Sequence, residues 1–162
     1  MSDETKTITL TVNGDKVTKL VDARQHLVDF LRGELALTGS HLGCEHGICG
    51  ACSVRLDGDV VRGCLILAIQ ADGTNIETVE GLTASGEIAD LQENFVERDA
   101  LQCGFCTPGM LITAAELLRE ATPKTRAEIR EFLSGNYCRC TGYHAIVDAV
   151  ETTLKQRLEK AS

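Results

Sequence analysis

Four cysteines in the first half of the chain have four, two and eleven residues between them, a spacing that limits what this half can fold around. They are Cys44, Cys49, Cys52 and Cys64. Plant-type [2Fe–2S] clusters take three ligands with the first two of these spacings and a fourth from farther along the chain. Gly43, Gly47 and Gly50 interrupt the same loop, where they let backbone N–H groups approach anionic sulfurs. The pattern predicts a [2Fe–2S] site, with a zinc ion or disulfides as the alternatives.

The other four cysteines lie in the second half of the chain and form a second candidate metal site. They are Cys103, Cys106, Cys138 and Cys140. Taken alone, this set suits a tetrahedral zinc ion as well as it suits a [2Fe–2S] cluster. The single residue between Cys138 and Cys140 is unusual for zinc sites, and the neighbouring iron site also favours a second [2Fe–2S] cluster. Together the two sets use every cysteine, so no thiol remains for a nucleophile or an odd disulfide.

Charge and composition narrow the range of partners. The chain has 162 residues, with 24 acidic against 16 basic side chains and a formal net charge of -8 at pH 7. This charge repels phosphate backbones and anionic lipid, so we expect neither nucleic acid nor a membrane as a partner. No apolar run follows the polar residues 1–6, so we expect no secretory signal and a cytoplasmic location. Thiols stay reduced in the cytoplasm, which favours metal ligands over disulfides.

The first half alternates apolar and polar residues, as half-buried β-strands do. Residues 7–12 alternate in this way and are followed by Asn13-Gly14, the pair favoured in a tight β-hairpin turn. Further strands are predicted near residues 16–21, 53–56, 60–62 and 75–79. Asp22 is expected to cap a short helix whose apolar side includes Leu27. This half is therefore predicted to be a small mixed sheet packed on one helix.

The second half repeats its apolar residues with the helical period of about 3.6. Thr107 is expected to cap a helix in which Pro108 is the first residue. Thr125 and Glu128 form a capping-box pattern at the start of another helix, which Gly135 is expected to end in a left-handed turn. Four helices are predicted, near residues 88–95, 107–118, 125–135 and 142–158. The predicted fold class is α+β, with a boundary around residues 79–85.

Four stretches of the chain carry a resemblance to a known family. They are GCEHGICGAC at 43–52, TVEGL at 78–82, QCGFCTPG at 102–109 and NYCRCTGY at 136–143. In these stretches the chain resembles the small iron–sulfur subunit of the molybdenum hydroxylases, which is related to xanthine dehydrogenase, aldehyde oxidoreductase and aerobic carbon monoxide dehydrogenase. The resemblance extends over nearly the whole chain, and no ligand position departs from the family pattern.

The resemblance implies a fold and a path for electrons. Residues 1–80 would form a plant-type ferredoxin-like (β-grasp) domain, and residues 81–162 a helical [2Fe–2S] domain built as a four-helix bundle. Electrons would pass from molybdenum to the cluster of the second domain, then to the cluster of the first domain, and then to FAD. By the same resemblance Gln102 would hydrogen-bond the pterin of the molybdenum cofactor, and the backbone around Cys140 would approach it. Without the resemblance, Gln102 reads as an exposed surface amide.

The resemblance also implies partners. A large subunit would carry the molybdenum cofactor as molybdopterin cytosine dinucleotide, a medium subunit would bind FAD, and two heterotrimers would assemble into a heterohexamer. The chain itself has no nucleotide-binding glycine loop, phosphate-binding loop or serine-nucleophile elbow, so the substrate pocket would belong to the large subunit. N-heterocycles, aldehydes, acyl thioesters and carbon monoxide all stay open as substrates. Two other functions are alternatives: a free ferredoxin-like electron carrier and a zinc-organised interaction module.

Overall fold

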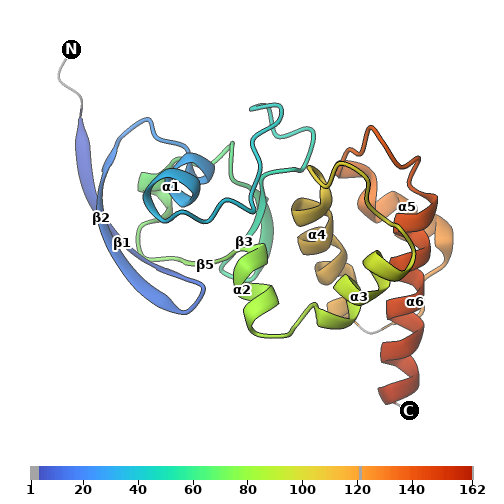
Figure 1. Ribbon diagram of the computed structural model, residues 1–162. Coiled ribbons are helices and arrows are strands. Elements are labelled where there is room, and N and C mark those ends of the chain that lie inside the picture. Colours follow the sequence, from blue (N-terminus) through green and yellow to red (C-terminus); the bar gives the residue numbers. More distant parts are fainter. Residues whose placement is uncertain (1–3, 121, 162) are drawn as a thin grey trace.

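The computed structural model describes residues 4–120 and 122–161, and shows the strands gathered at one side of the molecule and most of the helices at the other (Figure 1). The strands are β1 (Thr5–Val12), β2 (Asp15–Asp22), β3 (Ser53–Leu56), β4 (Asp59–Arg62) and β5 (Asn75–Glu77). The α-helices are α1 (Leu27–Glu34), α2 (Val79–Ala84), α3 (Ala89–Glu97), α4 (Thr107–Arg119), α5 (Arg126–Phe132) and α6 (His144–Ala161). Two short 3₁₀ helices are η1 (Ala68–Ala71) and η2 (Leu133–Gly135). The ends of the predicted segments 1–80 and 81–162, residues 1–3 and 162, lie outside the described residues.

The five strands form one mixed sheet in the order β2-β1-β5-β3-β4. β1 and β2 pair antiparallel, and the turn between them is made by Asn13 and Gly14, with φ of 51° and 89°. This is the left-handed pair of conformations that a type I′ hairpin turn requires, so the hairpin prediction is confirmed. β5 then adds parallel to β1 and antiparallel to β3, and β3 pairs antiparallel with β4. The antiparallel pairing of β3 with β4 thus places the start of β3 beside the end of β4.

One face of the sheet is buried against α1. Ile8 and Leu10 of β1 face this core, as their alternation predicts, and Phe30 and Leu31 of α1 pack on them. The predicted capping role of Asp22 is wrong. The residue before the helix is His26, while the Asp22 carboxylate accepts the backbone N–H of Arg24 over 2.7 Å in a turn of its own. That local turn satisfies the Asp22 side chain four residues too early for it to cap the helix.

The last strand is shorter than predicted, because β5 ends at Glu77 and the chain turns into α2 at Val79. Two hydrogen bonds hold the turning point: the Thr78 N–H donates to Asn13 Oδ1 over 2.8 Å, and Asn13 Nδ2 donates to Thr78 Oγ1 over 3.0 Å. They tie the end of β5 to the first hairpin turn. α2 was not among the predicted helices, because its six residues are too few to display a helical period.

Helices α2 to α6 share a second core, in which α4 lies between the sheet and helices α3, α5 and α6 (Figure 1). The structure has the four predicted helices, as α3 to α6. α4 begins one residue earlier than predicted, with Cys106 in the capping position and Thr107 as its first residue. The capping box of α5 is confirmed, since the Thr125 side chain accepts the N–H of Glu128 and the Glu128 carboxylate accepts that of Thr125.

The predicted left-handed turn at Gly135 is wrong. α5 runs on into η2, and Gly135 ends this 3₁₀ turn without a left-handed φ. Its carbonyl oxygen instead accepts Arg62 Nη2 over 2.9 Å, from the end of β4. A contact to a residue so distant in sequence decides this helix end, and no local pattern reveals it. Within residues 4–120 and 122–161 no helix combines the length and apolar character needed to cross a membrane.

Candidate metal centres

The first set of cysteines lies where the loop after α1 meets the β3–β4 hairpin. Cys44 and Cys49 are half-buried on the loop, while Cys52 and Cys64 are 2% and 1% exposed at the two ends of the hairpin. The hairpin brings these ends together, because Ser53 pairs with Arg62 and the Gly63 N–H donates to the Cys52 carbonyl oxygen over 3.1 Å. Antiparallel pairing is therefore what places Cys52 beside Cys64, although eleven residues separate them in sequence.

Backbone N–H groups of the loop point at the sulfur of Cys44. The N–H groups of Cys49 and His46 each donate to Cys44 Sγ over 3.4 Å. Glu45 takes a left-handed conformation, φ 55°, that helps to curl the loop around the sulfur. These donors lower the pKa of the Cys44 thiol to about 6. The loop thus stabilises a negative sulfur, as a thiolate ligand of iron requires.

The second set is built from the loop before α4 and the loop before α6. Cys103 and Cys140 are exposed, and their Sγ atoms lie 3.6 Å apart. Cys106 and Cys138 are partly buried and also adjoin one another, and burial raises the pKa of Cys106 to about 12, with Cys138 adding to the effect. Two thiolates on one tetrahedral metal, with metal–sulfur bonds of about 2.3 Å, lie roughly 3.8 Å apart. The Cys103–Cys140 pair is thus spaced to share one metal ion.

In both sets the four thiols lie next to each other in two pairs. The neighbouring pairs are Cys44 with Cys49, Cys52 with Cys64, Cys103 with Cys140, and Cys106 with Cys138. The described part of the chain, residues 4–120 and 122–161, places no three His, Cys, Asp or Glu side chains around one point suited to a single ion. A [2Fe–2S] cluster has four cysteine ligands shared between two irons, so it takes thiolates in pairs. The paired thiols therefore fit one such cluster at each set.

The two cysteine loops contact each other directly. The Tyr137 N–H donates to the Cys49 carbonyl oxygen over 2.8 Å, and Asn136 Nδ2 donates to the Gly50 carbonyl oxygen over 3.2 Å. Next to them the His41 ring stacks on the Phe105 ring, with 4.6 Å between centroids, and His41 Nδ1 lies 2.8 Å from the Phe105 carbonyl oxygen. Both loops are thus held in one interface.

The sequence predicted no role for two residues of this interface. Asn136 is 1% exposed and also accepts the Thr113 hydroxyl over 2.9 Å. Because Asn136 stands two residues before Cys138, its place in the sequence could have indicated a role at this interface. Arg62, which donates to the Ser53 hydroxyl as well as to Gly135, has no such signal, because its partners come together only in the folded chain.

Gln102 lies at the exposed edge of the second set. Its side chain is exposed next to Cys103, on the same edge as the exposed Cys140. The fold places Gln102 where it can reach a group outside the chain. The pterin contact itself stays a prediction.

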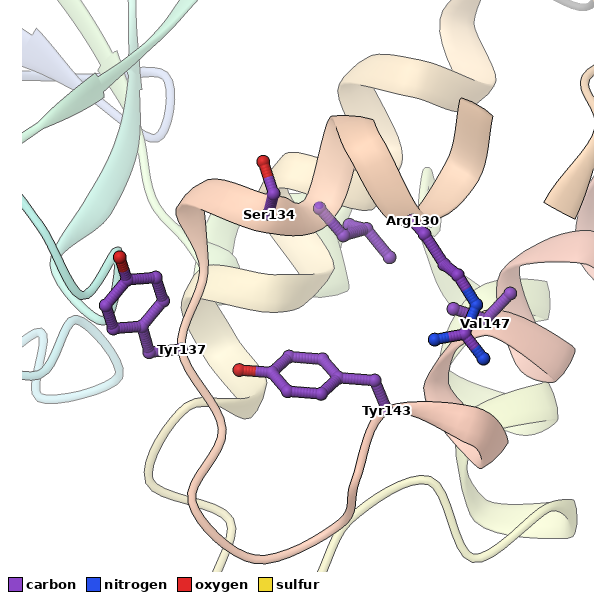
Figure 2. Close-up of a pocket in the computed structure, with 6 residues that line it drawn as sticks. Arg130, Ser134, Tyr137, Tyr143 and Val147 are labelled. Carbon is purple, nitrogen blue, oxygen red and sulfur yellow. The ribbon is translucent and has the colours of Figure 1, made fainter. Parts of the chain in front are cut away.

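A cavity of about 200 Å³ borders the loop that carries Cys138. Its lining residues are Arg130, Leu133, Ser134, Tyr137, Tyr143 and Val147. Figure 2 shows the Tyr143 ring lying across this loop, with its hydroxyl directed towards the beginning of the loop. There the hydroxyl oxygen accepts the Cys138 N–H over 2.7 Å. Tyr143 thus holds the loop in shape from the side of the cavity.

Comparison with known proteins agrees with this geometry. Residues 10–81 match the family model described as 2Fe-2S iron-sulfur cluster binding domain, and residues 78–151 match that described as [2Fe-2S] binding domain. The chain is 51% identical to the caffeine dehydrogenase subunit gamma of Pseudomonas sp. (strain CBB1), over 90% of this chain and 89% of that one. It is 54% identical to the nicotine 6-hydroxylase small subunit of Paenarthrobacter nicotinovorans, over 88% and 86%. The chain belongs to the small iron–sulfur subunits of the molybdenum hydroxylases.

A solved structure supports membership of this family of small subunits. The quinoline 2-oxidoreductase of Pseudomonas putida 86 contains a chain that superposes with a TM-score of 0.88 and 46% identity, over 96% of this chain and 97% of that one. As a small iron–sulfur subunit of a molybdenum hydroxylase, the chain is part of an oxidoreductase and binds two [2Fe–2S] clusters for electron transfer. Its relatives are named as subunits, among them the caffeine dehydrogenase subunit gamma and subunit beta of the 6-hydroxypseudooxynicotine dehydrogenase complex of Paenarthrobacter nicotinovorans. The family predicted from the four motifs is confirmed.

Proposed function

We propose that the chain passes electrons, one at a time, from the molybdenum cofactor of a large partner subunit to FAD on a medium partner subunit. Residues 1–80 form a plant-type ferredoxin-like (β-grasp) domain, and residues 81–162 form a helical domain. The cluster ligands are Cys44, Cys49, Cys52 and Cys64 in the first domain and Cys103, Cys106, Cys138 and Cys140 in the second. When bound, [2Fe–2S] clusters supply sites that take up and release single electrons.

The hydrogen bond from the Tyr137 N–H to the Cys49 carbonyl oxygen carries this proposal. Cys49 belongs to the first set of ligands, and Tyr137 is covalently bonded to Cys138 of the second set. A short run of covalent bonds and one hydrogen bond of 2.8 Å therefore connects a ligand of each set. Asn136, buried beside it, excludes water from the same contact. Such a connection supports electron exchange within the chain.

The exposure of the two sets supports their order in the path. Gln102, Cys103 and Cys140 are exposed together, which supports a partner cofactor docked at that edge of the second set. We assign the molybdopterin cytosine dinucleotide of the large subunit to this edge, with Gln102 as its hydrogen-bond partner. Beside the first set, Ile48 and Leu65 are 55% and 60% exposed, an apolar surface suited to the FAD-binding subunit. Two such heterotrimers form the proposed assembly.

The relatives named above act on compounds of one chemical class, because caffeine, nicotine and quinoline are all nitrogen heterocycles. We propose a nitrogen heterocycle as the substrate of the large subunit that this chain serves. The large subunit oxidises that substrate by two electrons, which the chain accepts singly. Purification from the native source tests the assembly. A large molybdenum-containing chain is expected to copurify, whereas a free monomer that exchanges electrons with several reductases would support an independent carrier instead.

The order of the two clusters is tested with Cys103→Ser in the complete complex. We expect substrate to stop reducing the first cluster, while dithionite still elicits the electron paramagnetic resonance (EPR) signal of that cluster. Tyr137→Ala is the matched control, because it changes an exposed side chain between the loops but keeps the backbone N–H. Substrate reduction of the first cluster at the wild-type rate in Cys103→Ser would show that electrons bypass the second set.

A further inference from the structure

The loop from Cys138 to Tyr143 closes on itself through three hydrogen bonds. The Cys138 N–H donates to the Tyr143 hydroxyl oxygen over 2.7 Å, and the Tyr143 N–H donates to Thr141 Oγ1 over 3.2 Å. The Thr141 hydroxyl in turn donates to Cys138 Sγ over 3.0 Å. The three hydrogen bonds therefore form a closed circuit that begins and ends at Cys138. Gly142 and Tyr143 both take left-handed conformations, with φ of 66° and 69°, and this reversal of the chain makes the circuit possible.

The circuit fixes the direction of the Thr141 hydroxyl proton. A threonine hydroxyl has one hydrogen to donate and lone pairs to accept with. The oxygen accepts the Tyr143 N–H with a lone pair, and its own hydrogen is donated to Cys138 Sγ. A left-handed backbone conformation is strained for a tyrosine, and the hydrogen bond between the Cys138 N–H and the Tyr143 hydroxyl holds it in place. The loop thus holds the Thr141 hydroxyl in position to donate to Cys138 Sγ.

We propose that Thr141 is a positioning residue that raises the reduction potential of the second cluster through its O–H···S bond to Cys138. This rests on the proposed function, in which Cys138 is a ligand of that cluster. The added electron increases the negative charge on the ligand sulfurs, so a donor aimed at one of them stabilises the reduced state more than the oxidised state. Neighbouring bonds in the circuit polarise the Thr141 hydroxyl further.

The two cysteine sets differ in the kind of group that donates a hydrogen bond to a cysteine sulfur. Cys44 accepts backbone N–H groups of His46 and Cys49 at 3.4 Å, whereas Cys138 accepts a side-chain hydroxyl at 3.0 Å in addition to the Thr141 N–H at 3.4 Å. A side-chain donor, unlike a backbone N–H group, can be removed by substitution.

The test is a redox titration of the complete complex with dithionite, followed by EPR, in which each cluster gives its own signal. Thr141→Val and Thr141→Ala remove the hydroxyl, and Thr141→Ser retains it. Thr83→Val is the matched control, because Thr83 lies on α2, outside both cysteine loops. In the two hydroxyl-free variants we expect a roughly tenfold shift of the second cluster towards its oxidised form at a given potential, which is about 59 mV for one electron.

The first cluster is expected to keep its midpoint in every variant, and Thr141→Ser and Thr83→Val are expected to titrate as the wild type does. An unchanged second midpoint in Thr141→Val or Thr141→Ala would overturn the role of Thr141. Loss of the second cluster in both hydroxyl-free variants would also overturn it, because Thr141 would then be a purely structural residue. Failure of the proposed function looks different, since the wild-type complex itself would lack one of the two EPR signals.

Discussion

Gly109, in the first turn of α4, packs so closely on Gly50 that a Cβ on Gly109 would overlap the Gly50 carbonyl oxygen. The same Cβ would lie 3.1 Å from the Gly50 carbonyl carbon and 3.2 Å from the Ala51 Cα. Gly50 stands between two cysteines of the first set, and Gly109 follows Cys106 of the second. The contact is backbone against backbone, so neither side can rotate away from an added methyl group. Here the two cysteine loops are joined by packing rather than by a hydrogen bond.

Gly109→Ala is therefore expected to push the two loops apart. Overpacking of this kind costs roughly 1–3 kcal/mol, so the melting temperature of the complex should fall by several degrees. Gly33→Ala is the matched control, because Gly33 lies in α1, has no neighbouring atom within 4 Å of its would-be Cβ, and gains helix propensity from alanine. Differential scanning calorimetry measures both. Equal melting temperatures for the two variants would contradict the close packing.

Asn136 joins the loops through side-chain hydrogen bonds, so Asn136→Ala is expected to cost roughly 2–3 kcal/mol. The variant leaves the buried Thr113 hydroxyl without its Asn136 partner and takes one donor from the Gly50 carbonyl oxygen. Adding Thr113→Val should recover part of the loss, because the unpaired hydroxyl is then gone as well. Asn75→Ala, at an exposed position in β5, is the control and should change stability little. A double variant no more stable than Asn136→Ala would show that the Thr113 bond is unimportant.

The pKa of Cys44, about 6, predicts how the iron-free chain reacts with iodoacetamide. The N–H groups of Cys49 and His46 favour the thiolate, so Cys44 is mostly ionised above pH 6 and mostly protonated below it. Its alkylation rate, followed by mass spectrometry, should be half-maximal near pH 6 and level by pH 8. Burial raises the pKa of Cys52 to about 11, which makes it the slow internal control. A Cys44 rate that keeps rising tenfold per pH unit to pH 8 would indicate an ordinary thiol with a pKa of about 8.5.

The sequence predicted those features that depend on neighbours along the chain. The Asn13-Gly14 turn and the Thr125–Glu128 capping box are local, and both form as expected. The cysteine spacing likewise predicted [2Fe–2S] binding, and the four motifs around the cysteines carried the resemblance to the family. The helix cap predicted at Asp22 and the left-handed turn predicted at Gly135 were wrong because other groups bind these residues. The Arg24 N–H donates to the Asp22 carboxylate, and the distant Arg62 donates to the Gly135 carbonyl oxygen.

The pairing of the thiols could not be predicted from the sequence, because it also depends on contacts between distant parts of the chain. Cys103 meets Cys140 only because the loops before α4 and α6 converge, and nothing in either loop alone specifies that contact. The bond between Tyr137 and Cys49 is also tertiary, since it joins the backbone of two loops that are far apart in sequence. Spacing can therefore point to candidate ligands, while the folding of the loops decides which thiols lie next to each other.

The most direct test of two clusters in one chain is iron and acid-labile sulfide analysis combined with EPR of the dithionite-reduced complex. Two [2Fe–2S] clusters require about four irons and four sulfides per copy of this chain, and two separate EPR signals of equal integrated intensity. Zinc in place of two of the irons, with a single EPR signal, would show that Cys103, Cys106, Cys138 and Cys140 hold a structural ion and would contradict the account.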